Sequence, residues 1–371
     1  MVELRKKGVK RPMQIRKIPI YYAKANMTIA QSVYDHAGLL LVPEDSALTP
    51  RVIIRLKLHG VDQIEIYDEK KSSDSLEGES STYINRIRQS EDYQKFNIAF
   101  SSSVDEFKKD INEVVTNNKE INIMKLTKEL DNLLAQDMRG TNMFDMLHCM
   151  RAYDDLTYVH SLNVALMCNV IGEWLHFSKQ DKYLLSLCGL LHDIGKLLVP
   201  KELITKPNKL TIEEFSTVKT HAYRGYELLK KQNIDERIKW AALMHHEKCD
   251  GTGYPDGLEG HQINDFAKIV AIADVYDAMT ANRVYRPGLC PFDVIEMFEA
   301  EGLQKYDAKF LLPFLERIAE FYINHEVYLS NEQRARVIMI NKCKLSKPVV
   351  QVQNKFIDLS QDLKLAIVAI L

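Results

Sequence analysis

The 371-residue sequence lacks the features that mark membrane-spanning, secreted or nucleic-acid-coating proteins. None of its apolar runs approaches the roughly 18 residues that a membrane helix requires, and no apolar signal core follows the segment Met1–Lys7. Its formal net charge is -2, so neither sign is in the excess that attracts nucleic acid or an anionic membrane surface. We therefore predict a cytoplasmic protein with no membrane span and no nucleic acid polymer as partner.

Cysteine is scarce, and none of the cysteines forms a CxxC pair. The six are at positions 149, 168, 188, 249, 290 and 343. This scatter indicates neither a zinc ribbon nor a disulfide framework. We expect buried thiols in a reducing compartment.

The first part of the chain, residues 1–68, is predicted to form a small α+β domain. Its short strands are expected at 18–22, 38–42 and 63–67. A helix is predicted to start after Thr49, because Pro50 suits the first helical position, and to end at Gly60. No residue of this part forms a pattern typical of a catalytic site.

Residues 69–145 are predicted to contain a linker and connecting helices. The segment 69–82 is too polar to pack into a core, whereas the helical pattern from 83 to 152 keeps one face apolar. Two interpretations of these helices stay open. They form a dimerisation or signalling coupler, which would give a homodimer, or they simply pack against the next domain.

Residues 146–325 are predicted to form an all-α domain of about five core helices. One helix carries an apolar stripe that runs from Leu184 to Leu191 and leads directly to His192. Another is expected to begin at Thr211, because carboxylates follow in its first turn. Residues 326–371 are predicted to form a β extension. The expected strands are at 335–340, 348–352, 356–358 and 366–371.

Five histidines and two aspartates fall at spacings that suit a site for two metal ions. They are His160, His192, Asp193, His221, His245, His246 and Asp274. Imidazoles and carboxylates hold Fe, Mn or Zn at open hydrolytic sites, and a helical bundle builds such a site from several helices. Asp193 suits a bridging role, because each of its oxygens can bind one ion. The remaining histidines of this region, such as His148 and His176, are expected to be ordinary core residues.

Two details of this cluster can be predicted from helical periodicity. His245 and His246 are adjacent, so their side chains should diverge by about 100° and rarely bind one ion together. Asp277 stands three residues after Asp274 and should face the same side, where it could orient a ligand.

A glycine-rich loop, 250–255, follows the second histidine pair. Gly251 and Gly253 permit positive φ, so the chain can turn tightly above the metals, and Tyr254 with Pro255 forms a rigid apolar tip. Three interpretations are open: a lid or substrate wall, a docking surface for another protein, or a structural turn.

Two segments resemble the signatures of a known family. They are His192-Asp193-Ile194-Gly195-Lys196 and His245-His246-Glu247-Lys248-Cys249-Asp250-Gly251-Thr252-Gly253-Tyr254-Pro255. The chain from about 153 to 322 resembles the HD-GYP domains, bacterial cyclic di-GMP phosphodiesterases of the HD superfamily. The resemblance implies a mainly α protein, with an HD-superfamily helical bundle between the small N-terminal α+β domain and the C-terminal β appendage. It also implies hydrolysis of cyclic di-GMP to pGpG, GMP or both.

The resemblance also assigns roles to residues. It implies that the seven histidines and aspartates bind two divalent ions, Fe or Mn, with Zn as the alternative. Asp193 and Lys196 are expected to be catalytic, with Lys196 either protonating the leaving oxygen or adding positive charge. The expected substrate contacts are Lys196, Gly253, Tyr254, Arg283, Tyr285 and Arg286.

Two positions depart from the family pattern. Leu156 replaces a glutamate that binds a third metal in some members, and Pro287 replaces a lysine that contacts phosphate. Because of Leu156 we expect two metal ions and not three, and because of Pro287 we expect one contact to the substrate phosphate fewer than in the family pattern.

Two alternatives to this function remain. The chain could be a receptor that binds cyclic di-GMP, or docks a GGDEF-type or other signalling protein through the Gly-Tyr-Pro loop, without turnover. It could also hydrolyse a different cyclic dinucleotide.

Overall fold

The computed structural model describes most of the chain. The described residues are 14–19, 23, 27–34, 40–48, 52, 56, 63–68, 87–134, 143–149, 156–206, 210–281, 288–362 and 364–371. These residues fall into two compact units, one within Met1–Gly78 and the other within Glu79–Leu371.

The first unit contains two small antiparallel pairs of strands. One pair is β1 (Gln14–Pro19) with β4 (Gln63–Asp68), and the other is β2 (Val33–Tyr34) with β3 (Leu40–Val42). Their apolar side chains form one buried cluster. The predicted strand 63–67 is confirmed, but the predicted strand 18–22 is displaced, because Ile18 pairs with Ile64 in a strand that begins at Gln14. Of the predicted helix after Thr49, only Val52 and Leu56 are described, and both are helical.

The second unit is built mainly from helices. The elements up to the region of the second histidine pair are α3 (Glu91–Asn117), α4 (Ile123–Leu134), α5 (Met143–Cys149), α6 (Leu156–Trp174), α7 (Lys179–Leu191), the 3₁₀ helix η2 (Ile194–Leu198), α8 (Lys201–Ile204), α9 (Ile212–Lys230) and α10 (Glu236–Met244). The later elements are α11 (Asp265–Thr280), α12 (Pro291–Met297), the π-helical turn η3 (Phe298–Gly302), α13 (Leu303–Lys305) and α14 (Ala308–Phe321).

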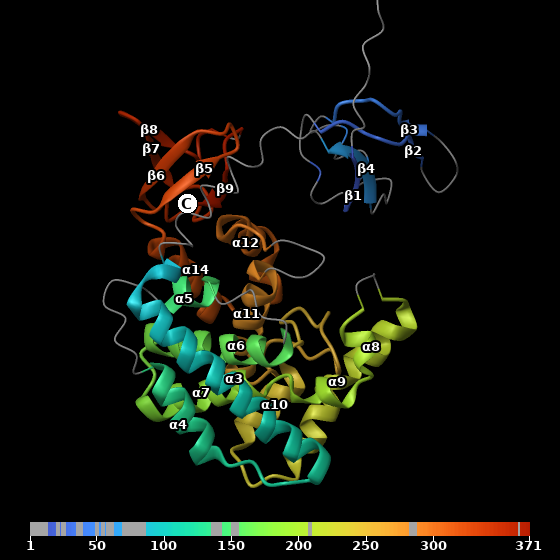
Figure 1. The fold of residues 1–371 in the computed structure, drawn as a ribbon, viewed down its shortest axis with the longest axis vertical. Coiled ribbons are helices and arrows are strands. Elements are labelled where there is room, and N and C mark those ends of the chain that lie inside the picture. The colour runs from blue at the N-terminus through green and yellow to red at the C-terminus, as the bar shows by residue number, and fades with distance from the viewer. Residues whose placement is uncertain are drawn as a thin grey trace, which may run out of the picture. The chain divides into compact units, whose positions relative to one another are not determined.

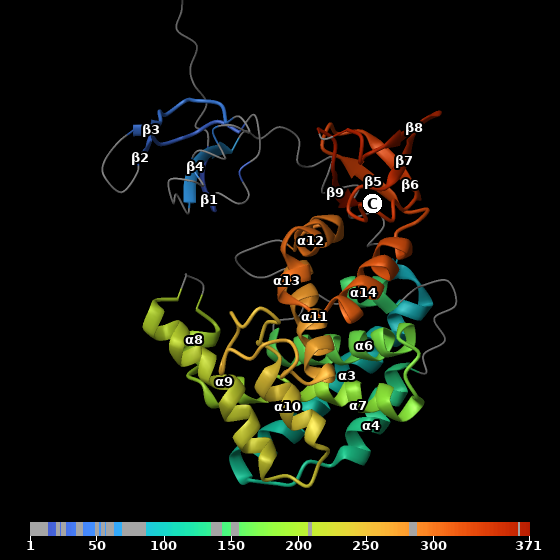
Figure 2. The same ribbon diagram turned by 180° about the vertical axis from the view of Figure 1, so that it is seen from behind.

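The helices of the site region pack around α6, α7, α10 and α11, which appear side by side in both views (Figures 1 and 2). α6 packs against α7 and α11, and α10 packs against α7, α9 and α11. α6 and α11 are apolar along most of their length, as expected for helices covered on several sides. This central position explains why side chains of these four helices and of α9 can meet in the interior.

Side-chain caps determine where several of these helices begin. Thr211 caps α9 as predicted, and Glu214 returns a hydrogen bond to the Thr211 backbone, which completes a capping box. Ser178 caps α7 and Asn264 caps α11 in the same way, through side-chain oxygens that accept backbone N–H groups. These starts fix the register of the helices that carry His192, His221 and Asp274.

The C-terminal residues form a five-stranded antiparallel sheet with the order β8-β7-β6-β5-β9. The strands are β5 (Glu326–Leu329), β6 (Arg334–Met339), β7 (Val349–Val352), β8 (Lys355–Asp358) and β9 (Ile367–Ile370). The sheet lies beside α12 and α14 at one end of the helices (Figures 1 and 2), and β9 contacts α12. The predicted β extension is confirmed, although β5 was not among the predicted strands.

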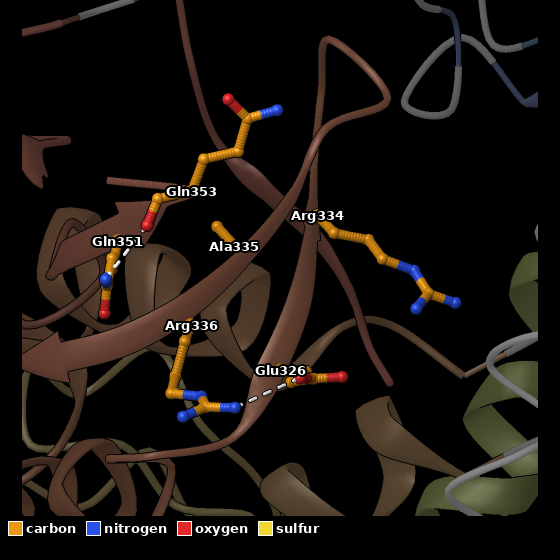
Figure 3. A pocket seen from close by; sticks show the side chains of 6 residues that line it. All are labelled: Glu326, Arg334, Ala335, Arg336, Gln351 and Gln353. Carbon is orange, nitrogen blue, oxygen red and sulfur yellow. Dashed lines mark hydrogen bonds and ion pairs between the residues drawn. The ribbon is translucent and has the colours of Figure 1, made fainter. Parts of the chain in front are cut away.

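A surface pocket lies on this sheet (Figure 3). It is lined by Glu326, Arg334, Ala335, Arg336, Gln351 and Gln353. Its polar groups pair with one another: Arg336 lies 3.3 Å from Glu326, and Gln351 donates to the carbonyl of Gln353 at 2.9 Å. None of the predicted site residues lines it.

The fold class predicted from the sequence is therefore confirmed as mainly α with a C-terminal β appendage. Among the residues that the structure describes, none of the helices is both long enough and apolar enough to cross a membrane.

Candidate metal centre

The seven predicted ligands come together in the interior of the helical unit. His160 lies on α6, His192 is the C-cap of α7, Asp193 precedes η2, His221 lies on α9, His245 is the C-cap of α10, His246 follows it and Asp274 lies on α11. Their ligand atoms fall into two groups, each small enough to hold one ion. The first group is Asp193, His221, His245 and His246, and the second is His160, His192 and Asp274.

Asp193 lies between the two groups, with one oxygen facing each of them. Its Oδ1 lies 3.4 Å from Nε2 of His221 and 3.5 Å from Nε2 of His245. Its Oδ2 lies 3.2 Å from Nε2 of His192 and 3.7 Å from Nε2 of His160. This is the arrangement that a bridging carboxylate requires.

Backbone carbonyls orient three of the histidines. The Nδ1 atoms of His192 and His221 lie 2.7 Å from the carbonyls of Gly189 and Val218. Nδ1 of His245 lies 3.0 Å from the carbonyl of Ala241. A carbonyl can only accept, so each Nδ1 carries a proton, and each ring directs its Nε2 toward the cluster.

The carboxylate of Asp277 orients a fourth histidine, His160. Nδ1 of His160 lies 2.7 Å from Oδ2 of Asp277, and Nε2 lies 3.0 Å from Oδ1 of Asp274. The other oxygen of Asp277 accepts a hydrogen bond from Nδ2 of the buried Asn163 at 3.2 Å. Asp277 thus orients the ring of His160, a candidate ligand, whereas Asn163 was not predicted, because a lone asparagine on an apolar helix gives no signal.

The structure contradicts the predicted divergence of the His245 and His246 side chains, whereas the expectation that the two rarely bind one ion together stays a prediction. Both belong to the first group, and their ring centroids lie 4.1 Å apart. The reason is that α10 ends at Met244, so His246 lies in the turn after the helix, where the 100° rotation of a regular helix no longer applies.

The charges differ between the two groups: burial lowers the pKa of His160 in the second group, but hydrogen bonds with Asp274 and Asp277 raise it to about 9. Burial alone would raise the pKa of Asp193, but the neighbouring His192 and Lys196 hold that pKa well below its usual range. Burial likewise opposes ionisation of Asp274, and hydrogen bonding with His160 keeps its pKa low. Burial lowers the pKa of His221 to about 4 and lowers the pKa of His245 and His246. The first group is thus a carboxylate with three neutral imidazoles.

Two atoms of the cluster point directly to cation binding. Nε2 of His192 and Oδ1 of Asp193 are buried and have no hydrogen-bond partner among the described residues. An unpaired buried polar atom is costly, and native proteins rarely keep one without an ion, a water or a function. The donor set of imidazoles and carboxylates is the one that divalent transition metals prefer. These residues therefore fit divalent metal ions.

Lys196 contributes the nearest positive charge. Its Nζ lies 2.5 Å from Oδ2 of Asp193, and the side chain is a quarter exposed. It therefore reaches from the rim of the site to the carboxylate between the two groups.

The backbones of η2 and α9 touch at Gly195 and Gly225. A Cβ on Gly195 would lie 2.0 Å from the carbonyl oxygen of His221 and 2.5 Å from the backbone nitrogen of Gly225. Only glycine fits here, which accounts for the glycine two residues after Asp193. The contact places Asp193 and His221 close together.

The Gly-Tyr-Pro loop covers the cluster from the side of His246. The Tyr254 ring lies 4.6 Å from the His246 ring at 30°, and the Tyr254 N–H donates to the carbonyl of His246 at 3.2 Å. Gly251 has the positive φ predicted for it, at 75°. Gly253 does not have a positive φ. It is needed because a Cβ there would lie 2.4 Å from the Cα of Glu247.

Glu247 anchors this loop and was not predicted. Its buried carboxylate accepts three backbone N–H groups, from Asp256 at 2.7 Å, Gly257 at 3.2 Å and Leu258 at 2.9 Å. The sequence signal was its position directly after the histidine pair, but a lone glutamate there does not reveal which backbone groups it binds.

The predicted substrate contacts Arg283, Tyr285 and Arg286 lie outside the described residues, as does Pro287. The backbone at Leu156 is described as the first residue of α6.

Comparisons with known proteins agree with this site. Residues 123–310, half of the chain, match the HD domain family. The chain is 30% identical over 243 residues to the cyclic di-GMP phosphodiesterase PA4108 of Pseudomonas aeruginosa, which covers 62% of this chain and 58% of that protein. It is 31% identical over 201 residues to the 3′3′-cGAMP-specific phosphodiesterase 2 of Vibrio cholerae, covering 53% of this chain and 38% of that protein.

A third relative shares a shorter and more similar segment. The cyclic di-GMP phosphodiesterase response regulator RpfG of Xanthomonas campestris is 41% identical over 122 residues, which cover 32% of each chain. The chain thus spans less than two thirds of the length of these relatives. With the family match over half of its length, the chain belongs to the HD domain family, and its two signature segments, folded into one site, resemble those of the HD-GYP domains.

Proposed function

We propose that the chain is a two-metal phosphodiesterase that hydrolyses cyclic di-GMP to pGpG, GMP or both. The observation that carries this proposal is the position of Asp193. Each of its two oxygens faces a different group of ligand atoms, as a bridge between two ions would require. The names of the relatives in Pseudomonas and Xanthomonas support cyclic di-GMP as the substrate.

The cofactors are two divalent ions, Fe or Mn, with Zn as the alternative. His221, His245 and His246 would hold one ion, and His160, His192 and Asp274 the other, with Asp193 serving both. Bound there, the ions lower the pKa of water and stabilise the negative charge that develops on the phosphoryl group.

The remaining residues of the site would position the substrate and balance charge. Lys196 is close enough to Asp193 to face a phosphate bound at the cluster, where its ammonium opposes the developing negative charge or protonates the leaving oxygen. Asp277 keeps the Nε2 atom of His160 directed toward Asp274. Tyr254 stacks on His246 and limits access of water from that side. Arg283, Tyr285 and Arg286 are proposed as further contacts to the substrate.

A second candidate substrate is 3′3′-cGAMP. It is favoured by the Vibrio cholerae relative, whose name gives this specificity and whose identity is as high as that of the Pseudomonas protein. The metal site alone does not distinguish the two substrates, because it contacts the phosphodiester that both contain.

The test is turnover by purified protein loaded with Fe, Mn or Zn against cyclic di-GMP, 3′3′-cGAMP and cyclic di-AMP, with products separated by chromatography. We expect cyclic di-GMP to be hydrolysed with the highest kcat/KM, and Lys196→Met to lower kcat by about 100-fold without loss of metal. Tight binding of cyclic di-GMP without hydrolysis, in metal-loaded protein, would replace this proposal with the receptor function. Preferred hydrolysis of 3′3′-cGAMP would change the substrate.

A further inference from the structure

Two residues of α9 that no prediction included lie beside the Gly-Tyr-Pro loop. The Phe215 ring lies 6.4 Å from the Tyr254 ring at 79°, in an edge-to-face arrangement. Nζ of Lys219 lies 4.8 Å from the centre of the Phe215 ring and 5.1 Å from that of Tyr254. Phe215 and Lys219 are four residues apart, so one face of the helix presents both. Phe215, Lys219 and Tyr254 together are called the aromatic platform here.

The platform is adjacent to the metal centre. Tyr254 contacts the rings of two candidate ligands, with centroids 4.6 Å from His246 and 6.3 Å from His221. Phe215 stands six residues before His221 on the same helix, and its ring lies 6.4 Å from that of Tyr254. A ligand bound at the cluster would therefore lie beside the platform.

Two groups of the platform are open to a ligand. Phe215 is 45% exposed although it is a large apolar side chain. Lys219 is half-buried, and within the described part of the chain its ammonium forms no ion pair and no hydrogen bond, only the two ring contacts. A partly exposed aromatic ring and an ammonium held by ring contacts suit a flat ligand with acceptor atoms at its edge.

A purine base has this chemistry. Every base offers a π-face that stacks on aromatic side chains, and guanine presents O6 and N7 as acceptors that lysine can bind. We propose that the aromatic platform is the base-binding subsite of the enzyme, where Phe215 stacks with a guanine and Lys219 donates to its edge. This inference rests on the proposed function, because it assigns the base of the same nucleotide substrate.

The experiment compares two ligands that differ only in the base. GMP and ribose 5-phosphate share the phosphate and the ribose, so the ratio of their dissociation constants for metal-loaded protein, measured by calorimetry, reports the base alone. The variants are Phe215→Ala, Phe215→Tyr and Lys219→Met. Tyr223→Ala is the matched control, because Tyr223 is also on α9 and 56% exposed. Metal content and thermal unfolding are measured for each.

We expect wild-type protein to prefer GMP over ribose 5-phosphate. Phe215→Ala should reduce this preference about tenfold, with no change for ribose 5-phosphate, and Phe215→Tyr should restore it. Lys219→Met should weaken GMP binding alone, and Tyr223→Ala should match wild type. Equal binding of both ligands by wild type, or an unchanged ratio in Phe215→Ala, would overturn the base subsite. If Lys219→Met weakens the binding of GMP and ribose 5-phosphate equally, Lys219 contacts the phosphate, and its proposed contact with the base is overturned.

Hydrolysis of cyclic di-GMP is recorded separately for each variant. If wild type hydrolyses cyclic di-GMP and Phe215→Ala hydrolyses it at the same rate, the proposed function stands and the platform does not bind the base of this substrate. A wild-type protein that hydrolyses none of the cyclic dinucleotides refutes the proposed function. The ratio of GMP to ribose 5-phosphate binding still decides whether the platform binds a base.

Discussion

Nδ1 of His160 lies 2.7 Å from Oδ2 of Asp277, so a carboxylate on α11 fixes the ring of a candidate ligand on α6. Asn163 holds the second oxygen of this carboxylate. A histidine oriented in this way presents Nε2 in one direction and is a stronger ligand than a free imidazole.

Asp277→Asn should therefore weaken metal binding in the group of His160, His192 and Asp274. Outer contacts of this kind are typically worth about 10- to 100-fold in metal affinity, so we expect one of two ions to be lost on dialysis. Elemental analysis before and after dialysis measures this. Asp265→Asn, at the exposed start of the same helix, is the control. Full retention of two ions by Asp277→Asn would contradict the role of Asp277.

Asp193→Ala should remove both ions, because each group loses the same residue. The variant should also lose cyclic di-GMP hydrolysis entirely, whereas substitution of a ligand from one group only, such as His246→Ala, should leave one ion. Metal content per chain distinguishes the two results. Near-normal turnover with two ions in Asp193→Ala would exclude the bridge. Three tightly held ions in the active wild-type protein would contradict the expectation drawn from Leu156.

Glu247→Gln should loosen the Gly-Tyr-Pro loop. An amide keeps one acceptor and turns the other oxygen into a donor, so at least one of the three backbone N–H groups loses its partner. Hydrogen bonds to a charged group contribute about 1.5 to 3 kcal/mol each, so we expect clearly faster amide exchange at residues 256–258. The control is Glu259→Gln, because Glu259 is an exposed residue just after the segment 256–258. Exchange equal to wild type at these amides would show that the loop does not depend on Glu247.

A pH dependence is expected from the packing of α3 against α4. Lys125 lies 2.7 Å from Asp110 and 3.6 Å from both Glu106 and Glu129. Burial and a hydrogen bond with Glu106 raise the pKa of Glu129 to about 7. The folded state thus holds a proton that the unfolded state releases near pH 4.5. The stability that this proton contributes is fully present below pH 4.5 and is lost as the pH rises through about 7.

Glu129→Gln removes this titration. The difference in unfolding midpoint between the variant and wild type should grow in favour of the variant as the pH rises from about 5 to 8. Thermal unfolding at several pH values measures it. A difference that is constant over this range would contradict the raised pKa of Glu129.

Much of the fold followed from local patterns. Thr211 and the apolar stripe before His192 located α9 and α7 correctly, because caps and helical periodicity are local properties. β5 was missed because its four residues continue directly from the helical region with no alternation over a useful length. The strand predicted at 18–22 differs from the observed β1, because pairing with β4, a long-range contact, determines where β1 begins.

The residues of the site also fall into those that the sequence could predict and those that it could not. The cluster of histidines and aspartates was predictable, since such spacings along apolar helices are typical of a metal site. Glu247, Asn163 and Phe215 were not, because their roles depend on groups brought near by folding: backbone N–H groups, a carboxylate 114 residues away and a loop tyrosine. The cytoplasmic location, the homodimer and a signalling partner at the Gly-Tyr-Pro loop stay predictions.

The contact between Gly195 and Gly225 has a consequence for how the site can diverge in sequence. The separation of η2 and α9 is determined there by main-chain atoms alone, which have no rotamers with which to adapt to a larger residue. Residues on the outer face of α9 can therefore change freely while the spacing between the ligands of the two elements is preserved. A site of this construction can acquire new substrate preferences on its rim and keep the same distance between Asp193 and His221.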